Sequence, residues 1–203
     1  MFARVSGYGL SLVPIWPYRF ERTATRPGSV TVTHWGGDAV RTATVHGPAH
    51  DPAVELSNAD SADQVVDISA GPVDQSWRVE TSLYSVAWPE GFRIEPPPDG
   101  GPSMFDLHGP DGALLYVQGP FADDRLPTPD QLVAPGQTVV VKRRVRDVEV
   151  VELAYVHEDA EWRQGYWLVP LGEGRSLVVT AQAPAARAAE TMRAGDLVAG
   201  TPG

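Results

Sequence analysis

Cysteine is absent from all 203 residues of the sequence. Disulfide bonds, thiolate catalysis and cysteine-based metal sites are therefore excluded together. Basic charge is also scarce, because 16 Lys and Arg stand against 26 Asp and Glu, a formal net charge of −10. Phosphates would repel such a chain, so the charge disfavours nucleic acid or an anionic membrane as a partner. It favours a soluble acidic protein, or a basic protein partner.

Long apolar runs are missing as well. The opening stretch MFARVSGYGLSLVPIW holds one Arg, and its apolar run is broken by Gly7, Gly9 and Pro14. These breaks argue against a signal peptide or a membrane span, so we expect a cytoplasmic protein. Arg outnumbers Lys fifteen to one, a usage that suggests a high-GC bacterial source.

Recognisable catalytic motifs are also lacking. The sequence contains no G-x-S-x-G nucleophile elbow and no glycine-rich phosphate loop. His108 and His157 could act as bases, but nothing in the sequence links either one to a nucleophile. We therefore expect no cofactor, and the sequence leans towards a non-enzymatic role.

Short strands joined by turns dominate what is present. The chain has 20 Gly and 19 Pro, together 39 of 203 residues, against roughly 12% in average usage. Val151, Leu153 and Tyr155 alternate with other residues at the two-residue period of a half-buried strand. Further strands are predicted over 137–145, 162–171 and 176–180. Short connections make neighbouring strands antiparallel, so this region predicts a meander.

The predicted domain organisation has three parts. Residues 1–50 are expected to form a β-rich subdomain. Residues 51–76 form an acidic, linker-like segment, because Asp51 to Gln75 holds six acids and no basic residue. Residues 77–203 are expected to form an antiparallel sheet with a C-terminal helix on one face. The predicted fold class is α+β, mainly antiparallel sheet built from meanders and hairpins.

The only long helix is predicted over 184–199. Proline is suited to the first turn of a helix, and Ala185, Ala188, Ala189 and Met192 share one face of small residues. Gly195 lowers the helix propensity near the end, so we expect the helix to stop early.

Four N-terminal residues are candidate metal ligands. His34, His46, His50 and Asp51 offer imidazole and carboxylate groups that suit zinc or another divalent ion. Gly47 and Pro48 separate His46 from His50, so these two cannot share a helix face. Surface histidines on turns are the simpler interpretation.

The run from Lys142 to Arg146 is the one local charge feature that opposes the acidic whole. On a strand, Lys142, Arg144 and Arg146 would point to one face and form a positive stripe that could receive an acidic partner. The favoured alternative is that the run pairs across the hairpin with Glu149 and Glu152.

The stretch Leu83–Phe92 reads LYSVAWPEGF. With the order of elements predicted after it, this stretch resembles the entry strand of PsbP-like domains, over about residues 78–199. The resemblance implies an antiparallel sheet flanked by helices and a non-catalytic binding or assembly role. It supplies no site residues. The chain departs from the pattern because residues 121–135 are irregular where a first helix is expected.

The sequence therefore favours a non-enzymatic, partner-binding protein of a bacterial cytoplasm, an adaptor or an immunity-type protein. One alternative is a small metal-dependent hydrolase that uses the N-terminal histidines. Another is a sheet that binds a small apolar ligand, which requires a large apolar cavity beneath the helix.

Overall fold

The computed structural model describes residues 3–23, 26–48, 50–58, 62–98, 101 and 103–200. The chain forms two compact units, residues 1–105 and residues 106–203, and the division falls inside strand β11 (Ser103–His108). Antiparallel strands make up most of the structure, and helix α1 (Ala188–Gly200) packs on the sheet of the second unit. The predicted α+β class is confirmed.

Unit 1 consists of two sets of antiparallel strands. One set has the order β7-β2-β1-β8-β9, and the other has the order β10-β3-β4-β5-β6. A 3-10 turn, η1 (Ala62–Gln64), precedes β7. The strands are β1 (Arg4–Gly7), β2 (Leu10–Pro14), β3 (Tyr18–Arg22), β4 (Val30–Gly36), β5 (Ala39–His46), β6 (Ala53–Ser57), β7 (Val66–Ala70), β8 (Arg78–Glu80), β9 (Ser85–Ala87) and β10 (Arg93–Glu95).

The structure differs from the linker predicted over residues 51–76. Strand β6 in this segment pairs with β5, and β7 pairs with β2, so both belong to unit 1. Val65 and Val66 are fully buried despite the acids around them. The high acid content misled the prediction, because short alternating strands can expose their acids and still bury an apolar face.

Aromatic rings form much of the core of unit 1. The ring centroids of Phe20 and Trp88 lie 6.4 Å apart, and those of Trp77 and Trp88 lie 6.5 Å apart. The indole N–H of Trp88 donates a hydrogen bond to the carbonyl of Phe92, at 2.6 Å. The Trp-Pro-Glu-Gly-Phe motif therefore serves the core, with both of its aromatic residues buried.

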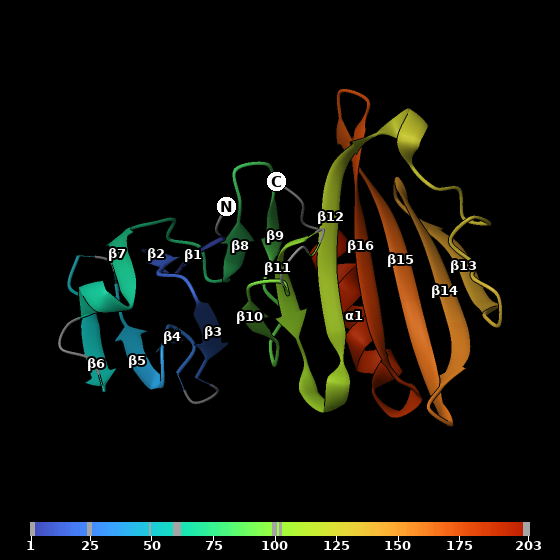
Figure 1. Cartoon of the computed structure of the whole chain (residues 1–203). Helices are drawn as coiled ribbons and strands as arrows, with labels where there is room; N and C mark the ends of the chain where they lie inside the picture. Colours follow the sequence, from blue (N-terminus) through green and yellow to red (C-terminus); the bar gives the residue numbers. More distant parts are fainter. Residues whose placement is uncertain are drawn as a thin grey trace. The chain divides into compact units, whose positions relative to one another are not determined.

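Unit 2 contains a meander of long strands in the order β13-β14-β15-β16-β12 (Figure 1). Each neighbouring pair from β13 to β16 is antiparallel, as the short connections predicted, and β12 also pairs antiparallel with β16. Helix α1 lies against β15 and β16. The strands are β12 (Leu114–Ala122), β13 (Thr138–Val145), β14 (Val148–His157), β15 (Ala160–Gly172) and β16 (Arg175–Pro184), and three 3-10 turns accompany them, η2 (Pro110–Gly112), η3 (Asp123–Arg125) and η4 (Ala185–Arg187).

Helix α1 continues past Gly195 to Gly200, so the predicted early end is wrong. The predicted small-residue face is also wrong in part, because Ala189 is exposed. The buried positions lie further along the helix. They are Thr191, Met192, Ala194, Gly195, Val198 and Ala199.

The buried face lies towards the end of the helix because the side chain of Trp167 packs there, and this side chain is 1% exposed. A Cβ atom built at Gly165 on β15 would lie 2.5 Å from Cη2 of Trp167. A Cβ atom built at Gly195 would lie 2.7 Å from Cζ2 of the same ring. Real Cβ atoms do not approach other atoms this closely, so both positions need glycine for the indole to fit between helix and sheet.

We expect Gly195→Ala to destabilise the protein although it raises helix propensity. The propensity gain is up to about 1 kcal/mol, whereas forcing a methyl group into a packed site costs about 1–3 kcal/mol. Gly200→Ala in the same helix is the matched control, because a Cβ there meets nothing within 4 Å. Urea unfolding measures both variants. Equal stabilisation by the two substitutions would contradict the close packing of Trp167.

Candidate binding pocket

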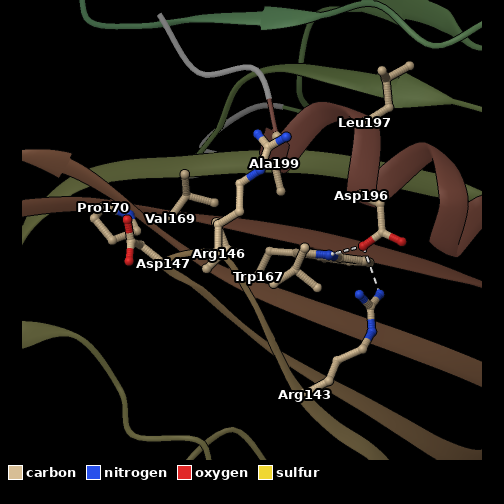
Figure 2. A pocket seen from close by; sticks show the side chains of 12 residues that line it. Arg143, Arg146, Asp147, Trp167, Val169, Pro170, Asp196, Leu197 and Ala199 are labelled. Atoms are coloured by element: carbon tan, nitrogen blue, oxygen red, sulfur yellow. Dashed lines mark hydrogen bonds and ion pairs between the residues drawn. The ribbon is translucent and has the colours of Figure 1, made fainter.

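A pocket of about 640 Å³ lies between the last turns of α1, the β13–β14 turn and the end of β15 (Figure 2). Its lining is mostly apolar, with four charged residues among the apolar ones. The lining residues are Arg143, Val145, Arg146, Asp147, Val148, Trp167, Val169, Pro170, Asp196, Leu197, Ala199 and Gly200.

One wall of the pocket is fixed by the carboxylate of Asp196. Its Oδ1 accepts a hydrogen bond from Nε1 of Trp167 at 2.8 Å and another from Nη2 of Arg143 at 2.7 Å. Arg143 also lies 3.5 Å from the carboxylate of Glu152. Figure 2 shows the two bonds converging on Asp196. The helix, β15 and β13 are thus connected through one carboxylate.

The ionic state of Arg143 follows from these contacts. Burial lowers the pKa of the guanidinium, but the hydrogen bonds and charges of Asp196 and Glu152 outweigh it and raise the pKa above its ordinary value. Arg143 is therefore a permanent cation in this wall, and it is already paired.

Strand register explains why Arg143 reaches the helix. Arg143 pairs with Val150, which pairs with Trp167, so the three residues form one row across β13, β14 and β15. Side chains of such a row share a face, and Trp167 places that face against α1. Because side chains alternate along a strand, Lys142 and Arg144 point to the opposite face.

The predicted basic stripe is therefore divided between different locations. Nζ of Lys142 bonds to Asp130 at 2.7 Å, and this hydrogen bond lowers the pKa of the Asp130 carboxyl. Arg144 lies opposite Glu149 in the register. Arg146 occupies the turn after β13, with φ of 55°, and lines the pocket. The expectation of one shared face fails for Arg146 because the strand ends before it.

The structure does not bring the four predicted metal ligands together. His34 on β4 contacts the carbonyl of Trp16 at 3.1 Å, whereas His46 on β5 bonds to Ser29. His50 and Asp51 lie in the following turn region. Within the described ranges, no group of three or more His, Asp or Glu side chains is arranged to hold a metal ion.

Sequence reasoning missed the residues that build the pocket wall, Arg143, Trp167 and Asp196. A signal for them exists, since Gly165 lies inside a strand and Gly195 lies inside a helix. Glycine weakens both kinds of element unless another group approaches the backbone closely. Two such glycines near a Trp therefore indicate where a helix packs.

Comparisons with known proteins add little to this picture. No protein-family model matches the chain, and no curated protein sequence matches it. A solved structure that is similar is LpqN, described as involved in cell envelope biogenesis of Mycobacterium tuberculosis. The similarity has a TM-score of 0.42 and 15% sequence identity, and it covers 59% of this chain and 81% of that chain. At this level it assigns neither a family nor a function.

In the part of the chain that the structure describes, no helix is long and apolar enough to cross a bilayer.

We expect graded losses of stability when Asp196 is replaced. Asp196→Ala leaves the Trp167 N–H without its acceptor and leaves the Arg143 guanidinium with Glu152 alone, a loss of about 1–2 kcal/mol. Asp196→Asn keeps an acceptor for Trp167 but loses the charge, so its effect is smaller. Urea unfolding at low and at high salt separates the two contributions, since salt screens the ionic part. Equal effects of Asn and Ala would contradict a role for the Trp167 bond.

Proposed function

We propose that the protein is a non-enzymatic binding protein that holds a segment of a partner protein in the pocket at the end of α1. The observation that carries this proposal is the pocket itself. Its volume of about 640 Å³ falls within the range of about 300–1,000 Å³ typical of ligand sites. Its wall is fixed before any partner arrives, because Trp167 and Arg143 are already bonded to Asp196.

The chemistry of the lining supports binding over catalysis. None of its 12 residues is Ser, Thr, Cys, His, Lys or Tyr. The lining therefore offers no side-chain nucleophile of these types and no imidazole that could act as a base. The Asp196 carboxylate is occupied by two donors, which leaves Asp147 as the remaining acid. A general acid–base pair needs more than this arrangement provides.

The same lining indicates what the partner brings. Val145 and Leu197 are 45% and 46% exposed, and both border the pocket. Arg146 forms no hydrogen bond or ion pair within the described residues. A partner segment with an apolar side chain next to a carboxylate would fit this lining. The apolar side chain would cover Val145 and Leu197, and the carboxylate would pair with Arg146. At this pocket, the local cation favours an acidic group on the partner, although the net charge of the chain favours a basic one.

A small apolar ligand is the second candidate. A helix-covered apolar cavity is the feature that this alternative requires, and the pocket lies against the helix. A ligand with an apolar body and a single acidic group would fit the same lining. The mass of any molecule that stays bound distinguishes the two candidates.

The test compares three forms of the protein in affinity purification from the native cell. Leu197→Glu introduces an acid at the pocket. Val156→Glu is the matched control, because Val156 is 68% exposed near the tip of the β14–β15 hairpin. We expect one protein to be recovered with wild type and with the control, and to be lost with Leu197→Glu.

Identical sets of proteins with all three forms would contradict the proposal. Native mass spectrometry of the same preparations reports a bound small molecule, which would favour the second candidate. Metal analysis reports a stoichiometric ion, which would favour the metal-dependent alternative at His34, His46, His50 and Asp51.

A further inference from the structure

Strand β13 is the outermost strand of the sheet in unit 2. One side of it pairs with β14, and within the described residues no backbone hydrogen bond reaches its other side. Figure 1 shows β13 at the margin of the sheet. A free strand edge presents a row of N–H and C=O groups that can pair with another extended chain.

Register identifies which groups of β13 are free. The hairpin closes at the pair Val145 and Val148, with Arg146 and Asp147 as its two turn residues. In a two-residue hairpin the closing pair is hydrogen-bonded, and the pairs then alternate. Arg144 therefore belongs to a non-hydrogen-bonded pair, and so does Lys142. Their backbone N–H and C=O groups point away from β14.

The side chains of β13 suit one type of partner. Its sequence is TVVVKRRV, in a chain with a net charge of −10. Lys142 and Arg143 are already paired with Asp130 and Asp196, and Arg144 is the cation of this run with no ion pair among the described residues. Val140 and Val145 are about half exposed at 49% and 45%. An extended segment that alternates acidic and apolar residues would match both features.

A second copy of β13 would not match the charge pattern of this edge. Antiparallel self-pairing around the run Lys142–Arg144 would set cations opposite cations, which is destabilising. The bulge between Val139 and Val141 also disturbs the regular edge, as edge strands that avoid pairing between copies often do. The charge pattern therefore selects a different, acidic chain.

We propose that β13 captures an extended, acidic segment of a partner protein by strand addition, with one apolar side chain of that segment entering the pocket. Arg143 and Val145 belong to the strand and also line the pocket, so the edge and the pocket form one continuous surface. This inference rests on the proposed function and specifies the conformation and charge of the bound segment.

The test uses a phage library of random 12-residue peptides, selected on wild type in low salt. We expect enrichment of sequences in which Asp or Glu alternates with apolar residues. The enriched peptides are then synthesised and titrated against Arg144→Ala and Arg144→Pro. Alanine removes the charge and keeps the N–H, whereas proline removes both.

We expect the alanine variant to bind a few-fold more weakly and the proline variant at least tenfold more weakly than alanine. Proline is tolerated on edge strands where the N–H faces outward, and urea unfolding checks that the variant folds. If Arg144→Pro does not fold, its titration is replaced by hydrogen exchange of the backbone amides of Lys142 and Arg144 in the wild-type protein. Both amides should become protected when the peptide binds.

Equal binding by the two variants, or unprotected amides in the complex, would overturn strand addition. Enrichment of basic peptides, or of none, would overturn it as well.

Failure of strand addition is distinguishable from failure of the proposed function. If Leu197→Glu still abolishes recovery of the partner while Arg144→Pro does not, the pocket binds without the edge. A wild-type dimer in sedimentation that Arg144→Pro dissociates would instead show that a second copy occupies the edge.

Discussion

The indole of Trp167 lies between Gly165 and Gly195, in a space that a Cβ atom at either position would close. The same ring donates its N–H to Asp196, and Asp196 also binds Arg143 on the edge strand. A short helix that contains glycine has little stability of its own, so tertiary packing must hold it. The position of the end of α1, and therefore the shape of the pocket, depends on the packing and the hydrogen bond of Trp167.

Neighbouring arginines at the pocket have different roles. Arg143 is satisfied by Asp196 and Glu152, and it serves the wall. Arg144 and Arg146 form no ion pair within the described residues, so their charges remain available to a partner. Placing paired and unpaired cations side by side gives a rigid site with an open, positively charged margin. A fixed wall lowers the entropy that binding must overcome.

Local patterns were sufficient for the strands and insufficient for the site. The alternation from Val151 to Tyr155 follows from the sequence, because the period of a strand is local. Whether Arg143 or Arg144 faces the pocket depends on which face the helix covers, and that is decided by tertiary packing. For the same reason Gly195 was interpreted as a helix end. The acidic composition of residues 51–76 predicts a linker, although the alternating apolar residues of this segment form strands.

Hydrogen–deuterium exchange of the backbone amides of residues 196–200 tests this account most directly. Helix propensity alone predicts that these amides exchange quickly, as in a frayed end. If Trp167 and Asp196 hold the helix end, the amides should be protected nearly as strongly as those of β15 and β16. Protection at that level would support a pocket that is formed before binding. Exchange as fast as in an unstructured peptide would contradict it.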